Sequence, residues 1–182
     1  MNMKLSHKFF LMLTAFAALS FTVLNNKWTF KTEEASVTFH LPNEGSKGSI
    51  KGLSGELVFD PANYSTGIMK ASVKVNTLTT GIDIRDKHLM TNDYFDEAKH
   101  PDITFTAESF SKTDTGFVAT GKLAMRDSVK TIQVPFTFSQ ENNKAVIKAR
   151  MDLQAGDYGV GKKSKKETDR VVVDITVPLF SE

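Results

Sequence analysis

Residues 81–105, GIDIRDKHLMTNDYFDEAKHPDITF, gather side chains of the types that carry out acid–base or metal chemistry. His88, Asp93, Asp96 and His100 all have ligand types that bind metal ions. However, the two histidines are twelve positions apart with a turn predicted between them, and this spacing matches neither an HExxH motif nor an i,i+4 pair. The sequence therefore predicts no metal site and no cofactor.

The same segment contains Arg85, Asp86 and His88, a possible acid–base group. General acid–base catalysis needs groups that converge on one cleft. Asp86 and His88 are two positions apart, and on a helix they diverge by about 200°. A serine hydrolase would need a GxSxG elbow, which the chain lacks. A hydrolase or other enzyme using these three residues remains an alternative, and a structural ion pair or helix cap is the favoured interpretation.

Helical caps account for several of these charges. The pattern predicts a short helix over residues 83–90, capped by Thr79 or Thr80, with Asp83 and Asp86 near its positive end. A second turn follows and ends at Pro101. We expect the whole segment to connect two strands.

A second polar stretch, GDYGVGKKSKKETDR, covers residues 156–170. Its glycines do not lead from a strand into a helix, so they predict a turn or bulge and not a dinucleotide loop. It carries a dense basic cluster, formed by Lys162, Lys163, Lys165 and Lys166. This cluster is either a solvated loop or a mouth that attracts an anionic head group.

The elements that position these segments are strands, because the rest of the chain alternates apolar and polar residues with period two. The pattern gives about nine strand candidates and almost no helix. Each run has one apolar face, which is typical of antiparallel sheets. The alternating apolar positions include Val37, Phe39, Leu41; Leu57, Phe59; Met69, Ala71, Val73, Val75; Ile103, Phe105, Ala107; Phe117, Ala119, Leu123, Met125; Ile132, Val134, Phe136, Phe138; Ile147, Ala149, Met151, Leu153; and Val171, Val173, Ile175, Val177.

A sandwich and a closed barrel both satisfy this pattern, and the length of the runs favours the barrel. The apolar face mixes large phenylalanines with small residues. In a barrel of about eight strands such a lining either packs solid or leaves room for one slender apolar ligand. The residue types alone favour a filled core, which would suit a structural or interaction protein.

The first residues are expected to be a leader. Lys4 and Lys8 precede an apolar run over residues 9–24, with small residues at Ala15 and Ala17. This arrangement predicts a signal peptide over residues 1–24, cleaved somewhere within 17–26, and one mature domain over 27–182. An uncleaved anchor is the alternative, although the run is shorter than the ~20 residues that span a membrane.

The sequence has no cysteine, which excludes disulfides, thiolate chemistry and lipoprotein attachment. Of 23 basic and 21 acidic side chains, two lysines fall in the leader, which leaves 23 − 2 = 21 against 21. A balanced charge gives no reason to expect nucleic acid as a partner.

Five ordered motifs resemble the YceI-like family of bacterial periplasmic proteins. They are GELVFDP (residues 55–61), TGIDIRDKHL (80–89), DYFDEAKHPDITF (93–105), TGKLAMR (120–126) and DYGVG (157–161). The chain departs from the family in its lysine-rich stretch, and in Asp127 where relatives often carry glycine. The departure at Asp127 puts in question the turn geometry of the hairpin predicted between Leu123 and Val134.

The resemblance implies an all-β fold, an eight-stranded antiparallel lipocalin-like barrel with a short helical segment between two strands. It also implies a non-catalytic periplasmic carrier, monomeric or homodimeric, that holds a long isoprenoid or similar lipid. On this basis we expect the lumen to be lined by Phe39, Phe59, Met69, Ala71, Val73, Leu89, Phe95, Phe105, Phe117, Ala119, Leu123, Phe136, Phe138, Ile147, Met151, Val173 and Ile175. Leu89, Tyr94 and Phe95 would close one end, with Arg85, Asp86, His88 and Asp157 as structural residues of the lid.

Overall fold

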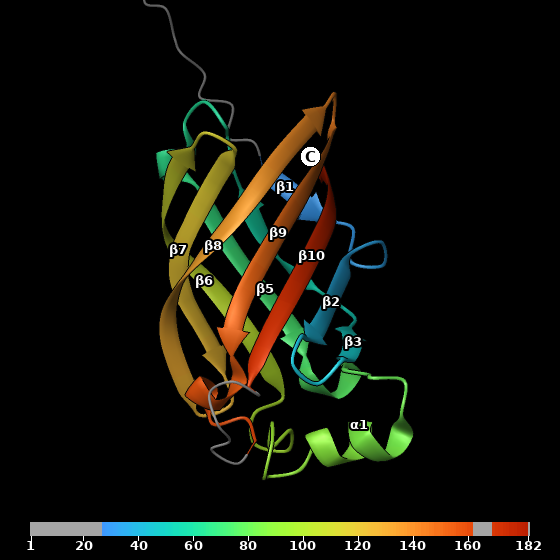
Figure 1. Ribbon diagram of the computed structural model, residues 1–182. Helices are drawn as coiled ribbons and strands as arrows, with labels where there is room; N and C mark the ends of the chain where they lie inside the picture. Colours follow the sequence, from blue (N-terminus) through green and yellow to red (C-terminus); the bar gives the residue numbers. More distant parts are fainter. Residues whose placement is uncertain (1–26, 162–168, 182) are drawn as a thin grey trace, which may run out of the picture.

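The computed structural model describes residues 27–161 and 169–181, which form an elongated β-barrel (Figure 1). The strands are β1 (Lys27–Phe30), β2 (Ser36–Leu41), β3 (Ser46–Ile50), β4 (Ser54–Val58), β5 (Ile68–Lys74), β6 (Asp102–Thr113), β7 (Gly116–Met125), β8 (Ser128–Glu141), β9 (Lys144–Gln154) and β10 (Arg170–Ser181). The helical elements are α1 (Asp83–Leu89) and the 3-10 turns η1 (Tyr64–Thr66), η2 (Val75–Thr77) and η3 (Ala155–Tyr158). The predicted leader lies outside the described residues.

The sheet closes on itself. Its strands follow the order β1-β4-β5-β6-β7-β8-β9-β10, and β10 then pairs with β1, with Ser181 opposite Trp28. All of these pairings are antiparallel. The predicted fold class, an eight-stranded antiparallel barrel with a short helical segment, is therefore confirmed.

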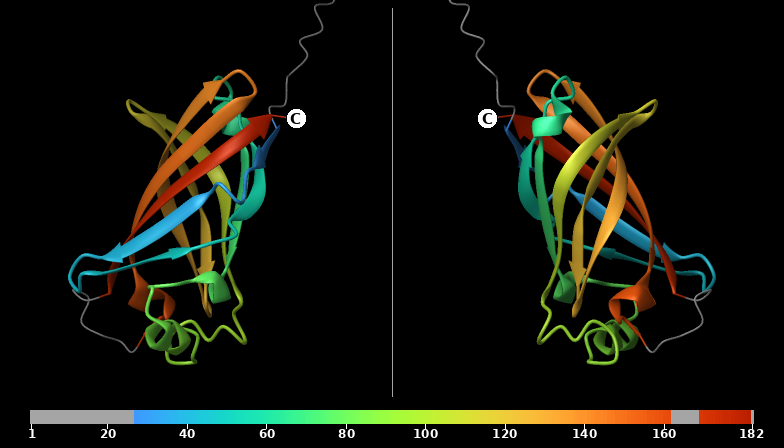
Figure 2. Two further views of the ribbon diagram at one scale, coloured as in Figure 1. Left: turned by 90° about the vertical axis from the view of Figure 1, so that its right-hand side faces the viewer. Right: turned by 90° about the vertical axis from the view of Figure 1, so that its left-hand side faces the viewer.

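The hairpin β2–β3 extends the barrel wall at one end. β2 pairs with the first half of β10, at Val172 to Thr176, while β1 pairs with its last residues. β3 pairs with β2 but not with β5, so the hairpin leans away from the barrel body at the end where α1 lies (Figure 2). Ten strands thus make a ring of eight with a two-stranded extension.

Strand β3 is absent from the nine strand candidates because SKGSI carries no alternating apolar face. Gly48 stands opposite Phe39, and a Cβ added to Gly48 would overlap the Phe39 ring and the carbonyl oxygen of Thr79. The aromatic ring therefore covers the glycine across the hairpin, and Ile50, opposite Val37, is the single apolar residue of β3 on that face.

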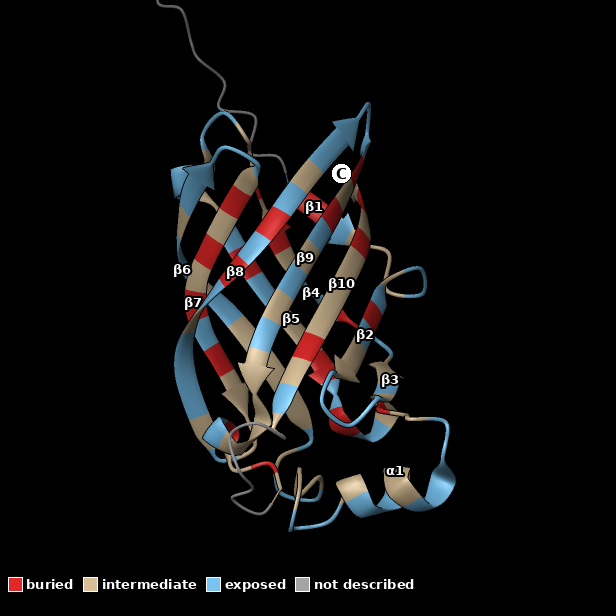
Figure 3. Cartoon of the chain, viewed as in Figure 1, coloured by how far each residue is buried: buried red, intermediate tan, exposed pale blue. Residues whose placement is uncertain are grey.

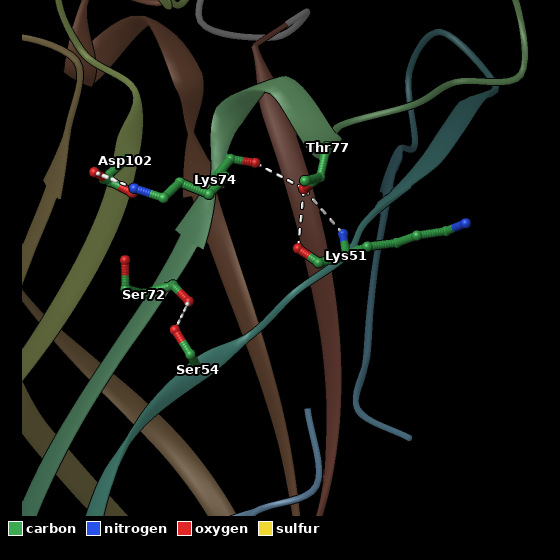
Figure 4. Close-up of polar contacts among 6 residues, drawn as sticks. All are labelled: Lys51, Ser54, Ser72, Lys74, Thr77 and Asp102. Atoms are coloured by element: carbon green, nitrogen blue, oxygen red, sulfur yellow. Dashed lines mark hydrogen bonds and ion pairs between the residues drawn. The ribbon is translucent and has the colours of Figure 1, made fainter. Parts of the chain in front are cut away.

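Polar contacts bridge the opening between β3 and β5. Ser49 and Thr79 exchange two backbone hydrogen bonds, of 2.8 and 2.9 Å. The Thr77 hydroxyl accepts from Lys51 N at 3.2 Å and lies 2.7 Å from the Lys74 carbonyl oxygen (Figure 4). On the next strand pair, Lys74 also forms an ion pair of 2.8 Å with Asp102. The gap in the ladder is thus closed by the segment that leads into α1.

The hairpin β7–β8 forms in spite of the missing glycine. Arg126 adopts a left-handed backbone with φ 53°, and Met125 pairs directly with Ser128. A non-glycine residue tolerates this conformation at a cost of roughly 1 kcal/mol. The departure at Asp127 therefore leaves a tight two-residue turn.

One end of the barrel interior is packed solid by aromatic rings, which we call the aromatic plug. Its members are Trp28, Phe59, Phe110, Phe117, Phe136 and Phe138. Phe59 is fully buried, and the centroid of its ring lies 5.0–5.6 Å from the ring centroids of four other phenylalanines. Trp28 Nε1 donates a 3.0 Å hydrogen bond to the Phe59 carbonyl oxygen, which satisfies the only polar atom of the indole.

Buried, half-buried and exposed residues alternate along the strands of the barrel (Figure 3).

Within residues 27–161 and 169–181, no helix has the length and apolar character needed to cross a membrane.

Candidate functional site

On one side of the barrel, formed by β9 and β10, the inner face is less buried in the half that lies toward α1, whereas Val73 of β5 and Leu123 of β7 are buried in that half. On β10 the inward residues Leu179 and Val177 are 1% and 4% exposed, whereas Ile175 and Val173 are only half-buried. Because these residues alternate with outward ones on a single strand, the change in burial runs along the length of β10.

Strand β9 shows the same change beside β10. Ala145 and Ile147 are buried, and Ala149 and Met151 are half-buried. Phe39 of β2 lies opposite Val173 and is also half-buried. We call the inner face of β9, β10 and β2 in this half the apolar wall.

A second buried cluster closes the end of the barrel beyond the apolar wall. Tyr158 of η3 and Val160 after it are 2% and 7% exposed, and they pack with Leu123. Tyr94 and Phe95, from the turns after α1, pack against this cluster. Residues 91–96, which we call the lid, and η3 therefore both close this end of the barrel.

Two hydrogen bonds to backbone carbonyl oxygens of the lid hold it in place. Gly161 N donates to the Asp93 carbonyl oxygen at 3.1 Å. Arg126 Nη2 donates to the Asn92 carbonyl oxygen at 2.7 Å. Gly159 ends η3 in the left-handed region, with φ 74°, where glycine is favoured over other residues. The motifs TGKLAMR and DYGVG thus meet at the lid.

Asp86 ties α1 to the strand-like segment before it. Its carboxylate accepts hydrogen bonds from the Thr79 hydroxyl at 2.7 Å, from Thr80 N at 2.8 Å and from the Thr80 hydroxyl. These bonds, those from Thr80 first, lower the pKa of Asp86. The predicted threonine cap is wrong in detail, because the N-cap is Ile82, which makes no side-chain bond. The threonines instead donate to a carboxylate one turn inside the helix.

Arg85 bonds to polar groups on both sides of the opening. Its Nε donates to the Thr80 hydroxyl at 2.9 Å, and Nη1 donates to Ser46 Oγ at 3.1 Å. Since Ser46 lies at the start of β3, this arginine connects α1 to the hairpin extension. The side chains of Arg85 and Asp86 are therefore both engaged in hydrogen bonds within the segment or to the hairpin extension.

The remaining acid–base and metal candidates do not converge. His88 is exposed and packs its ring against Tyr94, with 4.9 Å between centroids. Asp96 forms an ion pair of 3.1 Å with Lys99. Throughout the part of the chain that the structure describes, no group of three histidine, aspartate or glutamate side chains is arranged to hold a metal ion.

Tyr158 is the titratable group most enclosed by the lid end. Burial, and then the negative charge of exposed Asp157, raise the pKa of its phenol. Lys130 Nζ lies 6.0 Å from the centroid of the Tyr158 ring. The phenol is therefore a neutral packing element at physiological pH.

The predicted lumen residues fall into three groups. Those buried in the main core cluster are Phe59, Met69, Val73, Phe117, Ala119, Phe136 and Ile147, with Phe138 half-buried against them, and Val73 lies in the half of the barrel toward α1. Those half-buried between the clusters or beside them are Phe39, Ala71, Phe105, Met151, Val173 and Ile175. Leu123 and Phe95 belong to the lid end, and Leu89 is half-buried on α1 but in neither cluster.

Tyr158, Val160 and Arg126 were not among the predicted site residues. The repeated glycines of DYGVG indicated a turn at a barrel rim, and the aromatic and aliphatic residues between those glycines were the available signal. Lys162, Lys163, Lys165 and Lys166 lie outside the described residues.

Two open depressions lie in the outer wall, and small inward residues border both. The larger, of about 440 Å³, spans β7 to β10 and is lined by residues that include Thr137, Lys148 and Arg150. The other, of about 320 Å³, lies where Gly55 pairs with Ala71. Neither gathers a set of catalytic groups.

Comparison with known proteins identifies the architecture. The profile of the YceI-like domain matches residues 28–179. A UPF0312 protein from Photorhabdus laumondii is 30% identical over 125 residues, covering 67% of this chain and 64% of that protein. The chain thus spans less than two thirds of that relative's own length.

Solved structures agree with this fold. A YceI protein from Campylobacter jejuni has a TM-score of 0.68 at 25% identity, covering 79% of this chain and 88% of that one. A polyisoprenoid-binding domain from Saccharophagus degradans has a TM-score of 0.63 at 13% identity, covering 85% and 98% of the two chains.

Proposed function

The chain belongs to the YceI-like family, and on that basis we propose that it binds the apolar chain of an isoprenoid or similar amphiphilic lipid inside the barrel. Binding is non-covalent, and the protein acts as a carrier or reservoir without catalysis. The ligand lies along the apolar wall between the aromatic plug and the lid.

The change in burial along the inner face carries the proposal. Val173, Met151 and Phe39 are apolar and inward, yet they are half-buried although the same strands are fully packed further along. Burying a methylene group contributes about 0.8 kcal/mol, so an apolar chain gains several kcal/mol by covering this wall. Losses of ligand freedom offset part of that gain.

The polar groups nearest the lid support a carrier over an enzyme. Asp86 and Arg85 are engaged by Thr79, Thr80 and Ser46, and His88 points its ring at Tyr94. Among the similar structures, the Saccharophagus degradans domain is named for binding a polyisoprenoid. That similarity concerns the fold, and the ligand class is our proposal for this chain.

The basic residues before the apolar run at residues 9–24 further lead us to propose export to the periplasm. Fractionation of cells that express the full chain tests this part. Mature protein in the periplasmic fraction agrees with it, and precursor retained in the cytoplasm contradicts it.

The presence of a bound ligand is tested by organic extraction and native mass spectrometry of protein purified from the periplasm of its native host. We expect an apolar molecule to co-purify and to leave on extraction. Repeated absence of any such molecule would refute the proposal.

A pair of tryptophan substitutions on β10 tests the location. Val173→Trp places a large side chain on the apolar wall and should abolish co-purification, while the barrel keeps its circular dichroism spectrum. Thr176→Trp places the same side chain on the outer face of the same strand and should leave the ligand bound. Retention of ligand by folded Val173→Trp would show that the chain lies elsewhere.

The enzyme alternative has its own test. His88→Ala should leave the amount of co-purifying ligand unchanged, because the histidine is exposed.

A further inference from the structure

We propose that the aromatic plug sets the length of apolar chain that the barrel encloses, with Phe136 as the residue that limits its depth. This inference rests on the proposed function and specifies the ligand of that site. It predicts that the barrel encloses a short stretch of about ten to twelve main-chain carbons, and that any longer chain continues outside.

Phe136 marks the edge of the packed interior on the side that faces β9 and β10, whereas on β8 itself the next inward residue toward the lid, Val134, is also buried. Its ring is 4% exposed and lies 5.4 Å from the Phe59 ring and 5.6 Å from the Phe117 ring. Directly opposite Phe136 on β9 is Ala149, which is half-buried and stands next to Ile175 of β10. A small side chain thus meets the edge of the plug where the apolar wall begins.

The plug leaves no path for a chain to pass. Trp28, Leu57 and Leu179, which belong to the same core cluster as Phe59, are at most 1% exposed, and Ala119 is fully buried. Interiors packed in this way contain few voids larger than a water molecule. A ligand that reached further would have to displace several interlocked rings, since each phenylalanine ring of the plug packs against at least two other rings.

The opposite limit is the lid end. Leu153 of β9 packs against the cluster of Tyr158 and Val160. From Ala149 to Leu153 is four residues, which at about 3.3 Å per residue gives roughly 13 Å along the strand. A chain of carbon–carbon bonds of about 1.5 Å, arranged in a zigzag, crosses this distance in about ten bonds. In isoprenoid chemistry this lies between two and three five-carbon units.

The experiment measures the affinity of the purified, delipidated protein for geranyl, farnesyl and geranylgeranyl diphosphate by isothermal titration calorimetry. These carry the same head group on two, three and four isoprene units. We expect affinity to rise at least tenfold from geranyl to farnesyl, since buried methylenes drive it, and then to level off. An equal further rise at geranylgeranyl would overturn the inference.

Two substitutions move the limit in opposite directions. Phe136→Ala opens space at the boundary, so the rise should continue to geranylgeranyl. Ala149→Leu fills the start of the apolar wall, so the affinity should no longer rise from geranyl to farnesyl. This second variant keeps the test informative if Phe136→Ala fails to fold. The control is Phe180→Ala, on the outer face of β10, which should keep the wild-type length dependence.

The outcomes separate the two proposals. Binding without a plateau, or a plateau that neither substitution moves, refutes the role of the plug and leaves the proposed function standing. Failure to bind any of the three chains refutes the proposed function for isoprenoids.

Discussion

Replacing Phe59 by alanine should destabilise the barrel more than a change at any exposed position. The side chain is fully buried, and its ring contacts the rings of Phe110, Phe117, Phe136 and Phe138 at 5.0–5.6 Å. Phenylalanine-to-alanine changes in packed cores cost about 3–5 kcal/mol, because the lost transfer energy is joined by the energy of the remaining cavity. We expect the upper part of that range, since four interlocked rings cannot easily move into the space.

The measurement is the free energy of unfolding from urea titration, followed by the emission of Trp28, the only tryptophan of the chain. For a domain of this size, about 3–5 kcal/mol corresponds to a fall in Tm of roughly 6–20 °C. Phe180→Ala is the matched control. Its ring is half-buried on the outer face, with Lys31 Nζ 4.1 Å from the ring centroid, so we expect a loss of about 1 kcal/mol.

Equal losses for the two substitutions would refute the reasoning, because they would mean that the plug is no better packed than the outer surface. A change in the slope of the urea transition would indicate that the unfolded state also changed, and the comparison would then use Tm.

Three further predictions concern the lid and the hairpin extension. Because the pKa of Asp86 is lowered in the folded protein, its contribution to stability is complete above its ordinary pKa and is lost as the pH falls through the lower native value. Asp86→Asn should therefore weaken the fall of Tm at acid pH. An unchanged fall of Tm at acid pH would contradict this. Arg126→Gly removes the bond to the Asn92 carbonyl oxygen but suits the left-handed turn, so hydrogen exchange of residues 91–96 should accelerate while the free energy of unfolding does not fall; unchanged exchange would mean that the arginine does not hold the lid. Gly48→Val should cost about 1–3 kcal/mol in urea titration because its Cβ overlaps the Phe39 ring, and a neutral effect would show that the hairpin moves freely.

Most of the barrel could be predicted from the sequence because alternation is a local signal. Each strand with a continuous apolar face, such as β7 or β10, exposes its period directly. Strand β3 lacked that signal, because of the three residues on its inner face, Ser46, Gly48 and Ile50, only Ile50 is apolar, and Gly48 is covered by Phe39 of the partner strand. A strand defined by what its neighbour supplies cannot be recognised from its own residues.

The sequence indicated which residue types face the barrel interior, but not which of those residues are packed and which are half-buried. Phe39, Phe136 and Val173 were all expected to line one lumen, since residue type and parity are the same for all three. Which of them are packed depends on how rings from distant strands meet, and sequence spacing contains no record of that. The lid was found by its motifs, while the direction of its hydrogen bonds, from Thr79 and Thr80 to Asp86, required coordinates.

The division of the interior explains how one small barrel can be both stable and able to bind. A chain without disulfides must obtain its stability from packing, and the plug concentrates that packing at one end, where Trp28 and Phe59 also share a hydrogen bond. The lid end has a smaller apolar cluster, around Leu123, Tyr158 and Val160, and the lid is also held by hydrogen bonds from Gly161 N and Arg126. Loosening the lid should therefore change the rate of ligand exchange, whereas loosening the plug should change the stability of the fold and the length of chain that it accepts.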